Sequence, residues 1–244
     1  MKKLISKLSF IKPYLTKELL YMTIAVLAII IYKFLSFDEN AHMLLLKNVF
    51  GVTPATPGES DYWRYMMWFI SSFAYLFLIP FIGGLIIEGK NVFKKFGLKF
   101  NKPKIGIPLL LGAFVLMAVV ITIAVKLFPD FKQYYPFAKY AATNLRVFVI
   151  FELAYFSYFI GWEFFYHSFL VFPYEEKFGK PGAILIGLLP FVLMHYGKPL
   201  PEVAGSFIAG IFLSVLSLET RTFWYGMLLH GMVAIFMDIA VVYF

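Results

Sequence analysis

The amino-acid sequence predicts an all-α protein, a polytopic bundle of about seven transmembrane helices. Of its 244 residues, 61% are hydrophobic and 20% aromatic, only 15% are charged, and the mean hydropathy is +0.79. Soluble domains are roughly half apolar and about a quarter charged, so this composition excludes a soluble enzyme. The chain has no cysteine, which excludes a disulfide framework, a thiol nucleophile and a cysteine-ligated metal.

Seven stretches are long and apolar enough to be helices that cross the hydrocarbon core, which takes about 20 residues. They cover residues 19–37, 65–87, 105–127, 145–171, 182–196, 203–218 and 222–244. The fifth and sixth stretches are short, so we expect a tilted, broken or re-entrant helix there. A hidden eighth crossing is the alternative.

The basic residues predict an orientation. The chain has 22 Lys and Arg against 14 Asp and Glu, a net charge of +8. Membrane proteins keep Lys and Arg in cytoplasmic loops, where these residues meet anionic lipid headgroups. With the N-terminus inside, the cytoplasmic segments hold the majority of them: Lys2, Lys3, Lys7, Lys12, Lys17, Lys90, Lys94, Lys95, Lys99, Lys102, Lys104, Lys177, Lys180 and Arg221. We therefore expect an integral protein of the plasma membrane with a cytoplasmic N-terminus, and the lipid bilayer rather than nucleic acid as its partner.

Few ionisable residues fall at membrane depth, where each needs a water-filled cavity, a partner or a function. They are Glu152, Glu163, His167, His195, His230 and Asp238. Glu163 and His167 are four residues apart, so on a helix they share one face and reach the same proton, metal or water. Glu152 has aromatic neighbours, which favours an interhelical hydrogen bond. The group forms either an intramembrane hydrolytic or metal site, or a set of polar contacts that hold helices together.

Small residues in the sixth stretch predict how it packs. Ser206 and Gly210 are four residues apart and let another helix approach closely. We therefore expect residues 203–218 to pack directly against the helices that carry the candidate site.

Three segments of the C-terminal hundred residues carry a pattern of glutamate and histidine. The segment GWEFFYHSFL, residues 161–170, resembles the first motif of the CAAX-protease and bacteriocin-processing (CPBP, type II CAAX prenyl endopeptidase/Abi-like) family, which has paired glutamates followed after three residues by arginine. FVLMH, residues 191–195, resembles its second motif, a phenylalanine and a histidine four positions later, and His230 resembles the histidine of the third. The resemblance covers about residues 145–244.

This resemblance implies an all-helical bundle whose buried glutamates and histidines enclose a water-filled cavity, and peptide-bond hydrolysis within the membrane. It divides the chain into N-terminal spans and loops over residues 1–140 and a catalytic core over residues 141–244. Some members of the family cleave prenylated CAAX proteins after the modified cysteine, and bacterial relatives are associated with peptide processing, bacteriocin immunity or scaffolding. We expect a membrane-associated peptide or protein as the substrate.

The sequence departs from the family at three positions. Trp162 replaces the first glutamate, His167 replaces the arginine, and Ala234 replaces the usual asparagine four residues after His230. In the family the first glutamate is the usual water-activating base, so that role would pass to Glu163. An inactive membrane scaffold or bacteriocin-immunity protein of the same fold is therefore the alternative function.

The expected mechanism uses a water activated by a carboxylate, because no cysteine or recognisable paired serine provides a nucleophile. Glu163 is the candidate base, His195 would orient the water, and His230 would stabilise the oxyanion. His167 would orient Glu163 or meet a substrate carboxylate, and Asp238 would supply the polar group missing at Ala234 by hydrogen bonding to His230 or a water beside it. No cofactor is required by this mechanism.

A metal-dependent version of the reaction uses the same residues. Glu163, His195 and His230 are acceptable zinc ligands that would leave a position open for water. The sequence contains no His-Glu-x-x-His motif, so the three ligands would have to come from three separate helices.

Overall fold

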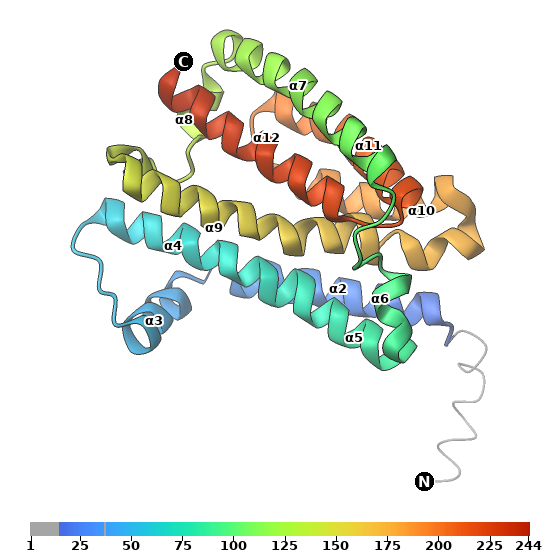
Figure 1. Cartoon of the computed structure of the whole chain (residues 1–244). Coiled ribbons are helices and arrows are strands. Elements are labelled where there is room, and N and C mark those ends of the chain that lie inside the picture. The colour runs from blue at the N-terminus through green and yellow to red at the C-terminus, as the bar shows by residue number, and fades with distance from the viewer. Residues whose placement is uncertain (1–14, 37) are drawn as a thin grey trace.

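The computed structural model describes residues 15–36 and 38–244, and over these residues the chain is helical and has no strand (Figure 1). The all-α prediction is confirmed. The long helices are α2 (Lys17–Leu35), α4 (Pro57–Ser72), α5 (Ile79–Glu88), α7 (Pro103–Leu127), α9 (Leu145–Phe164), α10 (Glu175–Leu193), α11 (Leu200–Thr220) and α12 (Trp224–Tyr243). The remaining helices are α3 (Glu39–Phe50), α6 (Val92–Lys95) and α8 (Asp130–Tyr134), and α5 continues the path of α4 through a π-helical turn at Phe73–Leu78.

Side chains that cap the backbone fix where several helices begin. The Thr16 hydroxyl accepts a hydrogen bond from the backbone of α2 at 3.3 Å, and the Asn144 amide oxygen accepts one from the backbone of α9 at 2.9 Å. Such caps satisfy backbone N–H groups that have no partner within the helix. Asn144 therefore sets the start of the helix that carries Glu163.

Six helical stretches of the described residues are long and apolar enough to cross a membrane, one fewer than the sequence predicts. The difference lies in residues 145–193, predicted as parts of two spans, which form one nearly continuous helical stretch. Within it, a π-helical turn at Phe165–Phe169 ends α9, and Gly179 breaks the helical path with a φ of 67°. Glycine adopts this left-handed conformation without steric cost, so α10 itself is kinked at Gly179.

Ion pairs sort the helix ends into two groups. At one end of the bundle lie the pairs Lys17–Glu88, Lys177–Glu18, Lys180–Glu219 and Arg221–Glu175. At the other end Lys198 pairs with Glu202. The basic residues of the first group are all among those predicted from the sequence to be cytoplasmic: Lys17, Lys177, Lys180 and Arg221. Lys198 is not among them. Which side is cytoplasmic stays a prediction. Lys2, Lys3, Lys7, Lys12 and Phe37, the predicted end of the first span, lie outside the described residues.

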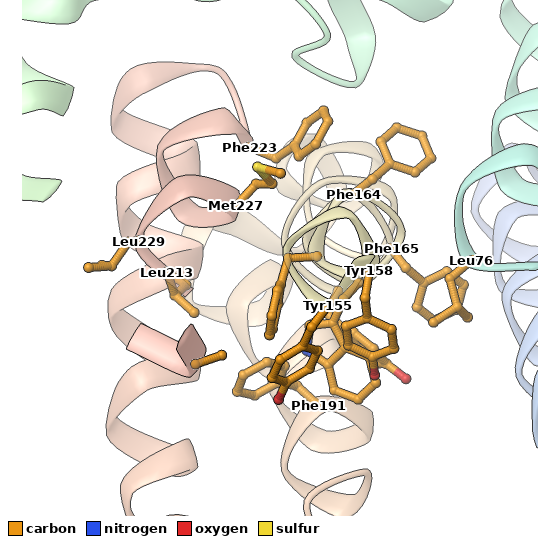
Figure 2. Close-up of a cluster of buried hydrophobic side chains, with 14 of the residues drawn as sticks. Leu76, Tyr155, Tyr158, Phe164, Phe165, Phe191, Leu213, Phe223, Met227 and Leu229 are labelled. Atoms are coloured by element: carbon orange, nitrogen blue, oxygen red, sulfur yellow. The ribbon is translucent and has the colours of Figure 1, made fainter. Parts of the chain in front are cut away.

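The core of the bundle is aromatic and surrounds α9, which runs between α4 and α12 (Figure 1). Phe69 of α4 stacks on Tyr155 of α9 with ring centroids 4.8 Å apart. Figure 2 shows that Tyr155, Tyr158 and Phe191 gather on one side of α9. Aromatic rings in such contacts stabilise a core beyond their buried area, so α9 is held firmly where it presents Glu163.

Two glycines permit close contacts between helices at the site. A Cβ atom on Gly161 of α9 would lie 2.4 Å from the backbone oxygen of Ser72. A Cβ atom on Gly210 of α11 would lie 2.7 Å from Leu188 and 2.8 Å from Phe191, both on α10. The prediction that residues 203–218 pack against a helix of the candidate site is therefore confirmed.

Candidate active site

Glu163 and His230 meet at the centre of the bundle. Glu163 lies in the last turn of α9 and is 0% exposed. His230 lies near the middle of α12, and its Nδ1 is 2.6 Å from Glu163 Oε1. When Glu163 is ionised its carboxylate only accepts hydrogen bonds, and Nδ1 of His230 is then the donor. The sequence places these residues 67 positions apart, and the packing of α12 on α9 joins them.

His167 lies on the other side of the same carboxylate. Its Nε2 is 3.9 Å from Glu163 Oε2, and the side chain is fully buried. Its Nδ1 is 3.0 Å from the hydroxyl oxygen of Ser214 on α11. Ser214 is a site residue that no motif in the sequence indicates. The signal that could have found it is its spacing, because Ser214 is four residues beyond Gly210 on the helix predicted to pack against the site.

His195 lies in the turn after α10. Its Nδ1 is 2.8 Å from the backbone oxygen of Phe191, which can only accept, so the imidazole donates from Nδ1. The rings of His195 and His230 are nearly parallel, at 10°, with centroids 6.4 Å apart. The Phe191 ring contacts all three imidazoles, with centroids 4.7 Å from His167, 4.7 Å from His195 and 6.0 Å from His230. The Phe191 ring therefore helps to set the distances between the three imidazole rings.

A cavity of about 230 Å³ opens beside these histidines. Its wall consists of two imidazoles, an aromatic surface and two lysines: His195, His230, Tyr65, Trp68, Tyr134, Phe137, Tyr155, Tyr158, Phe159, Trp162, Met194, Tyr196, Lys33 and Lys198. Glu163 and His167 do not line this cavity. Burial and the charge of Glu202 raise the pKa of Tyr134, in α8, to about 12, so its phenol is neutral at physiological pH.

Trp162 takes part in the wall of this cavity. Its indole ring lies 5.9 Å from the His195 ring, centroid to centroid, at an interplanar angle of 79°. Its Nε1–H is buried and finds no hydrogen-bond partner within the part of the chain that the structure describes. An unpaired buried donor is costly, and Trp162 carries this one beside the cavity.

Asp238 does not join the histidine cluster. The Nδ1 of His230 is bonded to Glu163, whereas the Asp238 carboxyl lies against that of Glu152 on α9. From the sequence, Asp238 is expected to hydrogen-bond to His230 or to a water beside it; its described carboxyl contact is with Glu152 instead, and a link through water stays a prediction. The eight-position spacing rotates Asp238 by about 80° from His230 around α12, which turns it toward Glu152. Both carboxyl groups are buried between α9 and α12, as expected of an interhelical contact for Glu152.

The donor atoms are not arranged as a metal centre. Among the described residues, no group of three or more His, Asp and Glu side chains is placed to hold a metal ion. Glu163 Oε1 and His230 Nδ1 bond to each other rather than to a shared point, and His195 Nδ1 is bonded to a backbone oxygen. The zinc ligand set suggested by the sequence does not fit this arrangement.

The segment that carries these side chains is similar to a known family. Residues 144–236 match the family model described as type II CAAX prenyl endopeptidase Rce1-like. The match includes Glu163, His167, His195 and His230 and ends before Asp238. No curated protein and no solved structure matches the chain. The resemblance predicted from the three motifs is thus confirmed by this match over residues 144–236.

Proposed function

We propose that this protein is an intramembrane endopeptidase that hydrolyses a peptide bond of a membrane-associated substrate with a water activated by its glutamate and histidines. The observation that carries the proposal is that His195, just after α10, and His230 of α12 line one cavity, with Glu163 of α9 bonded to His230 behind its wall. Buried ionisable groups that meet at a cavity inside a membrane bundle are typical of a functional site. The family match supports peptide hydrolysis as the reaction.

The cavity suits an extended apolar substrate segment. At about 230 Å³ it exceeds the roughly 30 Å³ that one water occupies in the liquid, so a water and part of a peptide fit together. Aromatic side chains form most of the wall and would bind an apolar chain, including a prenyl group. Lys198, whose ammonium is 2.6 Å from Glu202, adds a positive charge near the cavity.

The test uses purified protein in phosphatidylcholine vesicles and two quenched fluorescent peptides, one with a farnesylated cysteine near its C-terminus and one unmodified. We expect cleavage of the farnesylated peptide, and a loss of turnover on the order of 10²- to 10⁴-fold in Glu163→Gln and His195→Ala, since both remove a proton-transfer or water-orienting group. Glu152→Gln is the matched control, because Glu152 lies on the same helix, is buried and does not line the cavity.

The same assay separates this function from its rivals. A scaffold or immunity protein would cleave neither peptide and would keep its partner in all three variants. The observation that favours this candidate is Trp162, which stands where the family has a carboxylate. A zinc enzyme would lose activity on chelation and regain it with Zn²⁺, whereas a water activated by side chains alone predicts turnover that survives chelation. Absence of cleavage by the wild-type protein would overturn the proposal.

A further inference from the structure

The cavity reaches His230 but not Glu163. We infer that His230 is the catalytic residue that takes the proton from the attacking water, and that Glu163 is a positioning residue that acts through His230. This inference rests on the proposed function and assigns roles within the same site. It differs from the expectation drawn from the sequence, in which Glu163 meets the water directly.

Glu163 is more deeply buried than His230. Glu163 is 0% exposed and does not line the cavity, whereas the His230 side chain is 18% exposed and does. One carboxylate oxygen, Oε1, is engaged by His230 Nδ1 at 2.6 Å. The other, Oε2, lies 3.9 Å from His167 Nε2. A Cβ atom added at Gly226 would lie 2.8 Å from the same oxygen. Both oxygens therefore face protein groups.

The hydrogen bonds fix which nitrogen of each imidazole accepts a proton. Since Nδ1 of His230 donates to the carboxylate, the lone pair of the neutral ring is on Nε2. His195 donates from Nδ1 to the Phe191 oxygen, so its lone pair is also on Nε2. The two rings are nearly parallel and both line the cavity. A water in the cavity thus meets two acceptors, one for each of its hydrogens.

The reaction balances with these groups alone. His230 Nε2 takes a proton from water as the water oxygen bonds to the scissile carbonyl carbon and the carbonyl π electrons move to its oxygen. The imidazolium so formed is stabilised by the Glu163 carboxylate, as in the triad of serine proteases. When the tetrahedral intermediate collapses, the carbon–nitrogen bond breaks and the imidazolium gives its proton to the leaving nitrogen. The products are a carboxylic acid and an amine, and His230 is neutral again.

The experiment is chemical rescue, measured with the farnesylated peptide in vesicles. His230→Gly leaves space at the cavity wall, so imidazole in the buffer should restore kcat at least tenfold. The double variant Glu163→Gln/His230→Gly should gain little, because nothing orients the added imidazole. Formate should not restore Glu163→Gly, because the position of that carboxylate does not line the cavity. Glu152→Gln, with wild-type turnover, is the control for a buried glutamate elsewhere on α9.

A second comparison uses side chains of similar size in case the glycine variants do not fold. Glu163→Gln and His230→Gln should each lower kcat with KM within about twofold, and the double variant should be no slower than His230→Gln, because residues that act as a unit are not additive. Formate rescue of Glu163→Gly without imidazole rescue of His230→Gly would overturn the inference, as would near-normal turnover in His230→Gln. A wild-type protein that cleaves neither peptide would instead overturn the proposed function itself.

Discussion

The hydroxyl of Ser214 lies 3.0 Å from Nδ1 of His167 and so joins α11 to α9 directly behind the Glu163 carboxylate. Both side chains are fully buried. A hydroxyl that donates to Nδ1 leaves the proton of the neutral imidazole on Nε2, the atom nearest Glu163 Oε2. Ser214 therefore holds the His167 ring with Nε2 toward the carboxylate.

Ser214→Ala should reduce both stability and turnover. It leaves a buried imidazole nitrogen without its partner, which costs about 1–3 kcal/mol, and it frees the tautomer of His167. Thermal unfolding in detergent and kcat of the vesicle-bound enzyme measure the two effects. Ser206→Ala is the matched control on the same helix, because the Ser206 hydroxyl bonds only within α11, to the Val203 oxygen. Equal effects of the two substitutions would contradict the assigned role.

Gly226 provides the room that the Glu163 carboxylate occupies. A Cβ atom there would lie 2.8 Å from Oε2 and 3.4 Å from Leu213. Gly226→Ala should therefore displace the carboxylate from His230 and lower kcat by at least tenfold, with a smaller effect on the unfolding temperature. Gly112→Ala, also within a helix, has no atom within 4 Å of its new Cβ and should leave activity unchanged. Full activity of Gly226→Ala would show that the carboxylate position is not constrained from this side.

Asp238 is expected to contribute to stability rather than to turnover. Because its carboxyl lies against that of Glu152, Asp238→Asn keeps a hydrogen-bonding group between α9 and α12 and should preserve kcat. Asp238→Ala removes a buried polar partner and should lower the free energy of unfolding by about 1–3 kcal/mol. A tenfold fall in kcat for Asp238→Asn, with unchanged unfolding, would restore the earlier idea of a coupling to His230.

Much of the site follows from residue types and spacing, because ionisable groups are rare in this chain. The proximity of Glu163 to His167 follows from their four-residue spacing, and the motif pattern brings His195 and His230 to the same site. The burial of Glu163 behind His230 does not follow, since it depends on the packing of α12 against α9. The partner of Asp238 likewise depends on helix rotation, which one sequence leaves open.

The number of membrane spans is also not predictable from this sequence alone. Apolar stretches predict where most of the long helices lie. Hydropathy does not reveal that residues 145–193 stay helical through a π turn and a left-handed glycine. Those two local features decide where α9 ends and where α10 can bring His195. The geometry of the site therefore rests on backbone details that lie between the predicted spans.

Substitution of Trp162 tests whether this tryptophan, which replaces the family's first glutamate, has a function in the reaction. Its buried N–H has no partner among the residues that the structure describes, and its ring lines the cavity beside His195. If a substrate oxyanion accepts this N–H, Trp162→Phe, which keeps an aromatic ring, should lower kcat by about 10²- to 10³-fold with little change in KM, the cost of one lost oxyanion donor. Trp68→Phe is the control, because Trp68 lines the same cavity from α4. Equal losses in both variants would mean that the rings only shape the cavity, and unchanged kcat in Trp162→Phe would remove the indole from the mechanism.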